Sequence, residues 1–441
     1  MAISKTKQLE LLTARLLNLD PNITIKKIKL TPYGEVVYLE IPLPKIRVCT
    51  KCGSNNCNID AWEEHTFKHF PINNRKIFLH VDNRRLKCKD CNSSFSELPD
   101  WCIPNLRMSK DLYFAIIRDL TEVVSFRMIM RKECISESTI RSVFDSIEIL
   151  HPSRLPETLC IDEFKADTGY WIKRSKKWVK DSYNVNVTDW KRRVVIDVLQ
   201  QRNLTFLSKY FKGQYDKFER DQVRFFVCDM SGSFISLAKK CFPNARICID
   251  NFHLIQRLEK AVDNVRTRMQ NYYNDKGDNE SYKLLKHISY ILKTKTSNQL
   301  FKWGELTTEK RRKLENAFSV APELKTVYFA LQEFHEILDE TCFQVQKDSL
   351  SEWFEKYRHT DIKELKTPVN VFYSYRSYIL NAWRYGRSNG PCEGLNNKIK
   401  DVKRTMFGAH SFENFRKRIL LTCGGLSLAS DNLVFHISGK E

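Results

Sequence analysis

The order of apolar runs between residues 157 and 252 limits the fold more than any other feature of the chain. Three apolar, strand-like runs come first, followed by a helical stretch near 203–220, a fourth run, a second helical stretch and a fifth run. Strands that alternate with helices are typical of a sheet with helices packed on it. We therefore predict an α/β sheet in this segment.

The regions on either side of the predicted sheet have different patterns. The N-terminal part combines an opening helix, expected at about 5–18, with short β-like stretches. From 105 to about 150, apolar residues at three- and four-residue spacing predict helices, and the two prolines of 151–156 indicate a boundary. From 252 to about 385 the pattern is almost purely helical.

The charge of the chain points to its class of partner. Its 441 residues include 73 Lys and Arg against 53 Asp and Glu, which gives a net charge of +20. Such a surplus favours an anionic polymer, with nucleic acid as the first candidate. No apolar run approaches the ~18 residues that a membrane helix needs, and the N-terminus lacks a signal-peptide core. We expect a soluble, cytoplasmic protein with no membrane partner.

Two pairs of cysteines have the C-x-x-C spacing of metal sites: Cys49 with Cys52, and Cys88 with Cys91. Each such turn presents two thiolates to one ion, and tetrahedral Zn²⁺ takes four ligands of this kind at about 2.3 Å. A redox site would need only one pair and a thioredoxin-like βαβ pattern around it. Unliganded core cysteines remain the other alternative, and Cys57 is a possible substitute ligand. The spacing favours one structural zinc ion.

A helical hairpin expected within 124–150 is a candidate helix-turn-helix. A short polar break separates its two helices, and Ser136 or Ser138 could be the N-cap of the second. A recognition helix here would bring Ser138, Thr139 and Arg141 to the edges of DNA bases. Helical hairpins are also common in proteins that bind no DNA, so the nearby zinc motif and the basic charge are what favour this interpretation.

Three acidic residues could converge on one edge of the predicted sheet. Asp162 follows the apolar run LCI, Asp229 follows the run RFFVC, and Glu393 lies after the helical region. Open α/β sheets place their sites at such strand ends, and two Mg²⁺ or Mn²⁺ ions about 3.5–4 Å apart need shared carboxylate ligands. Singly, the two aspartates could be turn formers and the glutamate a partner of a helix dipole. Together they predict a two-metal site for phosphoryl transfer.

The helix that carries Glu393 is expected to have a basic face beside this site. Asn397, Lys400 and Arg404 follow the glutamate at helical spacing and fall on one side. We expect them to contact DNA phosphates. An ordinary solvated helix face is the alternative.

The order of these motifs resembles that of the ISL-three family of insertion-sequence transposases. The resemblance covers nearly the whole chain, and its most specific motif is SNGPCEGLNNKIK with the KR downstream; IDEF, DMS and FPNARICIDNFH also match. It implies an RNase H-like core with an Asp-Asp-Glu metal triad, in which Asp162, Asp229 and Glu393 take the three positions. Asp250 and His253 match a further motif of the family, and Asp250 is the alternative for the second aspartate.

The resemblance also implies cofactors, partners and a division of the chain. The cofactors are Mg²⁺ or Mn²⁺ and Zn²⁺, and the partner is double-stranded DNA, both the terminal inverted repeats of the element and the target. We expect a homodimer or higher oligomer on DNA, associated with the bacterial nucleoid. The expected regions are a zinc-binding domain (1–104), a helix-turn-helix region (105–152), the first part of the RNase H-like core (153–253), an all-helical insertion (254–385) and the rest of the core with the Glu helix (386–441).

Three classes of function fit these motifs. The first is a transposase that binds the ends of an insertion sequence and cleaves and transfers DNA strands. The second is a DNA-binding regulator with a zinc finger, a helix-turn-helix and an inactive RNase H-like domain, but the presence of all three acids argues against it. The third is an RNase H-like nuclease, which has little use for a long helical insertion and a separate sequence-reading module.

Overall fold

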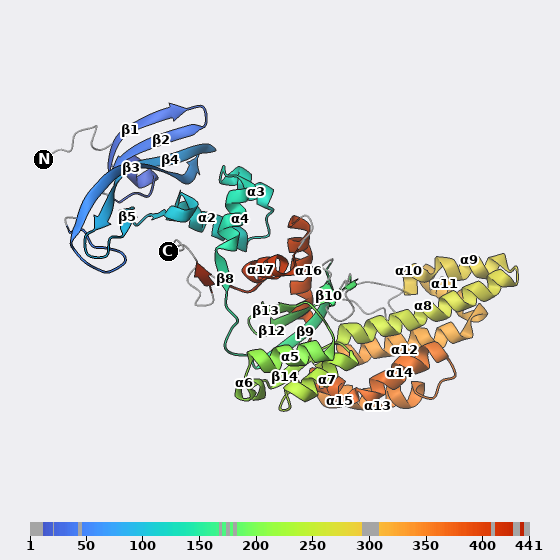
Figure 1. The fold of residues 1–441 in the computed structure, drawn as a ribbon. Coiled ribbons are helices and arrows are strands. Elements are labelled where there is room, and N and C mark those ends of the chain that lie inside the picture. Colours follow the sequence, from blue (N-terminus) through green and yellow to red (C-terminus); the bar gives the residue numbers. More distant parts are fainter. Residues whose placement is uncertain are drawn as a thin grey trace.

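The computed structural model of the chain contains two main sheets and a long helical region (Figure 1). One sheet lies near the N-terminus, and the helices of 251–385 extend from the second sheet on the side away from the first. The residues that the structure describes are 12–20, 22–42, 46–166, 170–172, 177–179, 183–292, 308–406, 411–426 and 433–435. Within them, no helix is both long enough and apolar enough to cross a membrane.

The N-terminal sheet is built on one long hairpin, formed by β3 and β4. The two strands pair antiparallel, with Cys57 opposite Cys88 at the open end. Asn73 and Asn74 form the turn, and both have the positive φ values, 49° and 61°, that a two-residue hairpin turn of this kind needs. The strand order is β1-β2-β4-β3-β7-β6, with β5 also paired to β4. The strands are β1 (Thr24–Thr31), β2 (Gly34–Glu40), β3 (Cys57–Ile72), β4 (Arg75–Cys88), β5 (Ser94–Ser96), β6 (Cys102–Ile103) and β7 (Met108–Ser109).

Before this sheet, the helix expected at about 5–18 is described from residue 12 and runs to residue 16. After the sheet come three short helices, each begun by a serine. Ser109, Ser125 and Ser136 are the N-caps, and each side chain accepts a backbone N–H of the first turn. The helices are α2 (Lys110–Thr121), α3 (Phe126–Lys132) and α4 (Glu137–Asp145). The hairpin expected from the sequence is thus α3–α4, and Ser136 is the N-cap of its second helix.

The second sheet has five strands in the order β13-β12-β9-β14-β15. The first three pair antiparallel, whereas β14 runs parallel to both β9 and β15. This confirms the α/β sheet predicted from the sequence, with two helices between β13 and β14 where one stretch was expected. The elements are β9 (Thr158–Lys165), β10 (Tyr170–Ile172), β11 (Lys177–Val179), β12 (Tyr183–Asp189), β13 (Val194–Leu199), α5 (Leu204–Gln214), α6 (Lys217–Asp221), β14 (Phe225–Cys228), α7 (Gly232–Cys241) and β15 (Arg246–Ile249).

Between β15 and α16 the described elements are all helices, as the pattern predicted. Its first helix, α8, follows β15 directly and packs against α12 and α14. A single hydrophobic core continues from the sheet into these helices, so the helical region is anchored to the sheet by buried apolar residues. The helices are α8 (Asn251–Asp275), α9 (Asn279–His287), α10 (Ser289–Leu292), α11 (Thr308–Val320), α12 (Pro322–Asp339), α13 (Phe343–Tyr357), α14 (Lys363–Ser374) and α15 (Arg376–Tyr385).

The last part of the chain returns to the five-stranded sheet. There α16 packs against β9 and β12, while α17 packs against β13. A short strand, β16, pairs antiparallel with β8, which lies just before the sheet in sequence. These elements are β8 (Ile147–Ile149), α16 (Gly390–Thr405), α17 (Phe412–Cys423) and β16 (Leu433–Phe435).

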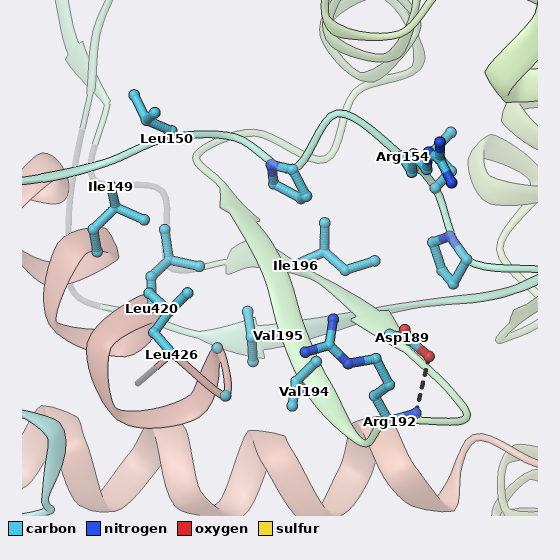
Figure 2. Close-up of a pocket in the computed structure, with 15 residues that line it drawn as sticks. Ile149, Leu150, Arg154, Asp189, Arg192, Val194, Val195, Ile196, Leu420 and Leu426 are labelled. Atoms are coloured by element: carbon cyan, nitrogen blue, oxygen red, sulfur yellow. Dashed lines mark hydrogen bonds between the residues drawn. The ribbon is translucent and has the colours of Figure 1, made fainter. Parts of the chain in front are cut away.

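A cavity of about 230 Å³ lies where the segment after β8 passes the edge strand β13 (Figure 2). Leu150, Ile196 and Leu426 contribute to its apolar lining. At one side, the carboxylate of Asp189 accepts the backbone N–H of Arg192 at 3.0 Å. None of the three acidic residues singled out in the sequence lines this cavity, so it is separate from the expected catalytic edge.

Arg418 of α17 joins the C-terminal segment to the N-terminal helices. Its side chain is 1% exposed, and its guanidinium donates to the carbonyl oxygens of Leu120, Glu122 and Val124. These carbonyls lie at and just beyond the end of α2, where a helix leaves carbonyl groups without intrahelical partners. Burial lowers the pKa of Arg418 to about 10, so the group remains protonated at neutral pH.

We expect Arg418→Met to destabilise the protein by about 2–4 kcal/mol, because it removes the guanidinium donor from the carbonyl oxygens of Leu120 and Val124. Urea denaturation of the purified protein measures the change. Asn414→Ala, at an exposed position of the same helix, is the matched control and should change stability by less than about 0.5 kcal/mol. Equal stability of Arg418→Met and the wild type would show that this contact does not hold the two segments together.

Candidate active site and zinc site

The four paired cysteines meet at one point in the N-terminal domain. Their sulfur atoms all lie within 4.8 Å of one another, with Cys49 and Cys91 3.6 Å apart and Cys52 and Cys88 also 3.6 Å apart. A tetrahedron with arms of about 2.3 Å has edges of about 3.8 Å, so this set fits one Zn²⁺ ion. Cys57 is not part of the group, because its thiol points to the carbonyl oxygen of Ser54.

The two cysteine turns share the same backbone conformation. Gly53 and Asn92, each directly after the second cysteine of a pair, both have a left-handed φ, +74° and +59°. Ser93 lies between the turns, with its hydroxyl 3.4 Å from the sulfur of Cys49 and 2.8 Å from that of Cys91. The Ser93 hydroxyl and a backbone N–H lower the pKa of Cys49 to about 6. The thiolate form that binds zinc is therefore favoured there.

Four carboxyl groups gather at one edge of the five-stranded sheet. Asp162 lies in β9, Asp229 directly follows β14, and Asp250 directly follows β15. Because β9, β14 and β15 are parallel neighbours, the three aspartates come from adjacent strands. Glu393, in the first turn of α16, completes the group.

The sequence analysis placed Asp162 after its strand, and this placement is wrong. The residue lies inside β9, opposite Asn186 of β12. The apolar run stops at Ile161, but the pairing with β12 continues to Lys165, because both strands are central to the sheet. Asp162 is only 7% exposed as a result.

Burial and mutual repulsion raise the pKa of two of these carboxyl groups. Burial brings the pKa of Asp162 to about 6, with the charges of Asp229 and Asp250 adding to the shift. Burial also raises the pKa of Glu393 to about 7, helped by the charges of Asp250 and Asp162. His253 opposes both shifts. Carboxyl groups with pKa values shifted this far cluster at functional sites.

Three groups of the edge are close enough to share one ion. Asp250, His253 and Glu393 offer ligand atoms within 4.8 Å of one another. Within the described residues, the Nε2 atom of His253 is buried and has no hydrogen-bond partner. Asp229 lies outside this group, and its Oδ1 accepts the backbone N–H of Ser231 at 2.9 Å. The carboxylate and imidazole donors fit a divalent cation.

The sequence analysis missed Asn396, which holds Asp162 in place. Its amide donates to Asp162 Oδ2 at 2.9 Å and accepts from the amide of Asn186 at 3.1 Å. Asn396 is buried and lies three residues after Glu393, on the same face of α16. The sequence shows the three-residue spacing from Glu393 to Asn396, but it gives no sign that the Asn396 side chain is buried against Asp162. Only the neighbouring Asn397, on the exposed face, was therefore predicted to have a role.

The residues expected to contact DNA are mostly exposed. On α16, Asn397, Lys400 and Arg404 all face solvent, and the charge of Lys400 acts on Glu393. On α4, Ser138 is exposed and Arg141 forms an exposed ion pair with Glu137. Thr139 is different: it is buried, and its hydroxyl accepts from Lys68 at 3.1 Å. The side chain of Thr139 therefore belongs to the packing of α4 against the N-terminal sheet.

Two sequence families match the chain. The ISL3 family of DDE transposases, described as "Transposase", matches residues 159–419, more than half of the chain. The chain belongs to this family. A second family, "zinc-finger of transposase IS204/IS1001/IS1096/IS1165", matches residues 45–91, which contain all four paired cysteines. The protein thus has a zinc ribbon domain followed by a DDE transposase domain.

A relative that matches over most of its length agrees with the family match. The "Transposase for insertion sequence element IS1001" of Bordetella parapertussis is 22% identical over 389 residues, covering 87% of this chain and 90% of that protein. A protein named "ATP-dependent protease" from Lactococcus lactis subsp. lactis is 42% identical over 59 residues, 13% of this chain and 19% of its own length. The second match covers too little of either protein to support an argument about function.

We expect purified protein to contain about one zinc ion per chain, bound by the four cysteines. The double variant Cys88→Ser/Cys91→Ser should lose the zinc, because two ligands of one tetrahedral ion are removed. Elemental analysis after gel filtration measures this. Cys342→Ser, at an exposed cysteine of the insertion, is the control and should keep the zinc. Freshly purified wild-type protein without zinc would contradict the assignment.

The raised pKa of Glu393 predicts a pH-dependent stability in protein stripped of divalent cations. The folded state binds the proton more tightly than the unfolded state, so the wild type loses stability as the pH rises from about 4.5 to about 7. Glu393→Gln carries no such charge. The melting temperature of Glu393→Gln minus that of the wild type should therefore increase as the pH rises from about 4.5 to about 7, and stay constant at higher pH.

Thermal melts in EDTA between pH 4 and 8.5 test this, with Glu355→Gln, at an exposed position of α13, as the control that should show no such trend. A difference between Glu393→Gln and the wild type that does not change with pH would mean that the environment of Glu393 does not resist ionisation.

Proposed function

We propose that this transposase binds the ends of an insertion sequence and catalyses metal-dependent cleavage and transfer of DNA strands. The observation that carries the proposal is that Asp162, at one edge of the sheet, interacts electrostatically with both Asp229 and Glu393. We assign these three residues as the catalytic triad, with Mg²⁺ or Mn²⁺ as the cation. In addition, the strand order, three antiparallel strands followed by two parallel ones, supports an RNase H-like core.

The chemistry follows from what the triad can hold. Bound divalent cations would lower the pKa of the attacking water or DNA 3′-hydroxyl. They would also neutralise the negative charge that develops on the leaving 3′-oxygen. Asp162, Asp229 and Glu393 would hold the cations, and Asn396 keeps Asp162 turned toward α16 by its hydrogen bond. No covalent protein–DNA intermediate is needed, so cleavage and strand transfer are the same displacement with two nucleophiles.

Positioning of the DNA would come from the exposed face of α16. Asn397, Lys400 and Arg404 lie on the helix that carries Glu393, so a phosphate bound to them would be placed beside the triad. The overall charge of +20 supplies the long-range attraction to the DNA backbone. These three residues are our candidates for phosphate contacts at the site.

Recognition of the element ends would lie in the N-terminal half of the chain. The zinc-binding domain (1–104) and the α3–α4 hairpin (within 105–152) form the proposed recognition module. Ser138 and Arg141 remain the candidates for base contact, since both are exposed on α4. We propose that 153–253 and 386–441 form the catalytic core, that 254–385 is an insertion into it, and that the protein acts as a homodimer or higher oligomer on DNA.

We expect Glu393→Gln, Asp162→Asn and Asp229→Asn each to reduce Mg²⁺-dependent nicking of end-bearing DNA by at least about 10³-fold. Each change keeps the size of the side chain but removes a charge that the cations need. Gel assays with purified protein and supercoiled DNA carrying the two ends measure the rate. Binding to the same DNA, measured by mobility shift, should be unchanged.

The matched control is Asp361→Asn, an exposed acidic residue of the insertion, which should nick at the wild-type rate. Substantial nicking by any one of the three triad variants would remove that residue from the triad. If the wild type nicks the DNA but never joins a 3′ end to a target, the RNase H-like nuclease is the better description.

A further inference from the structure

Two hydrogen bonds tie the end of the helical insertion to its beginning. The amide of Asn381, in α15, donates to the carbonyl oxygen of Ile247 in β15 at 3.1 Å. The indole N–H of Trp383, also in α15, donates to the side chain of Asn251 at the start of α8 at 2.6 Å. The two junctions of the insertion with the sheet therefore lie side by side and are fastened together.

A third tie at this base runs through the carboxylate of Asp250. Its Oδ2 accepts the backbone N–H of Phe252 at 2.9 Å, which makes Asp250 the N-cap of α8. Its Oδ1 accepts the backbone N–H of Asn389 at 2.7 Å, at the start of α16. The carbonyl oxygen of Asn389 in turn accepts the N–H of Glu393, closing the first turn of that helix.

Asp250 thus lies between the N-termini of two helices, both of which attract negative charge. It is only 3% exposed, less than Asp162, and both of its carboxylate oxygens accept a backbone N–H. The side chain of Asn389 is fully buried, and within the described residues its amide has no hydrogen-bond partner. The link between the two helices at this point therefore passes through the backbone of Asn389 and the carboxylate of Asp250.

We propose that Asp250 is a positioning residue, which joins the N-termini of α8 and α16 and so sets Glu393 at its distance from Asp162. This inference rests on the proposed function and assigns a role within it. It also makes the base of the insertion part of the active-site geometry, because a shift of α8 against the sheet moves Glu393 with it. The competing role for Asp250 is that of a cation ligand, since it lies within 4.8 Å of His253 and Glu393.

Cysteine substitution separates the two roles. A thiolate binds Mn²⁺ better than it binds Mg²⁺, because it is the softer ligand. Asp162→Cys and Asp229→Cys should therefore be inactive in Mg²⁺ and recover part of their nicking activity in Mn²⁺. For each variant, the ratio of the rate in Mn²⁺ to the rate in Mg²⁺ should be at least tenfold higher than the same ratio for the wild type. Asp250→Cys should lose activity to the same extent in both. A selective gain of Asp250→Cys in Mn²⁺ would overturn the inference and make Asp250 a ligand.

A second variant removes the donor and leaves the carboxylate in place. Asn389→Pro lacks the backbone N–H, and the φ of −84° at this position is close to the range of proline. We expect the nicking rate to fall about tenfold to a hundredfold, as for other small misplacements of catalytic groups, with the half-saturating Mg²⁺ concentration changed less than about twofold. Wild-type activity of this variant would also overturn the inference.

The matched control is Trp383→Phe, which removes another hydrogen bond at the same base and leaves both hydrogen bonds of Asp250 in place. It should nick at a rate within about twofold of the wild type at a temperature where both are folded, as confirmed by circular dichroism. If Trp383→Phe is as impaired as Asn389→Pro, Asp250 has only a general structural role. Failure of the proposed function itself looks different: the wild type would show no metal-dependent nicking, or Asp162→Cys would remain fully active in Mg²⁺.

Discussion

One edge of the five-stranded sheet holds several carboxyl groups close together where water is partly excluded. Repulsion and burial both oppose ionisation, and the raised pKa values of Asp162 and Glu393 are the direct result. The structure offsets this cost with fixed donors: the amide of Asn396 faces Asp162, and backbone N–H groups face Asp229 and Asp250. These donors keep the carboxylates in place without neutralising them, which leaves their charge available to cations.

The same edge explains why the chain is interrupted by so long a helical region. Three of the carboxylates come from adjacent strands, but the fourth arrives on α16, after the insertion has left the sheet at β15 and returned through α15. A residue so far along the sequence can be placed accurately only if the two junctions of the insertion are fixed to each other. The carboxylate of Asp250, which accepts backbone N–H groups at the starts of both α8 and α16, joins the two junctions.

Much of this architecture could be predicted from the sequence, because its signals are local. The two C-x-x-C pairs indicate a zinc site even when the path of the strands between them is unknown. In the structure, the hairpin turn at Asn73 brings the two pairs together. Strand and helix periodicity likewise predicts the sheet. Side-chain direction could not be predicted in the same way, because tertiary packing decides it: Thr139 turns inward to Lys68, and Asn396 turns inward to Asp162.

We propose that the carboxylate edge binds a pair of divalent cations when DNA is present. Electron paramagnetic resonance of Mn²⁺ bound to the wild-type complex with end-bearing DNA tests it most directly. The account predicts two manganese ions per catalytic domain, magnetically coupled as expected for a separation of about 3.5–4 Å. It would be contradicted if the wild-type complex bound no more Mn²⁺ than a triple variant in which Asp162, Asp229 and Glu393 are replaced by their amides.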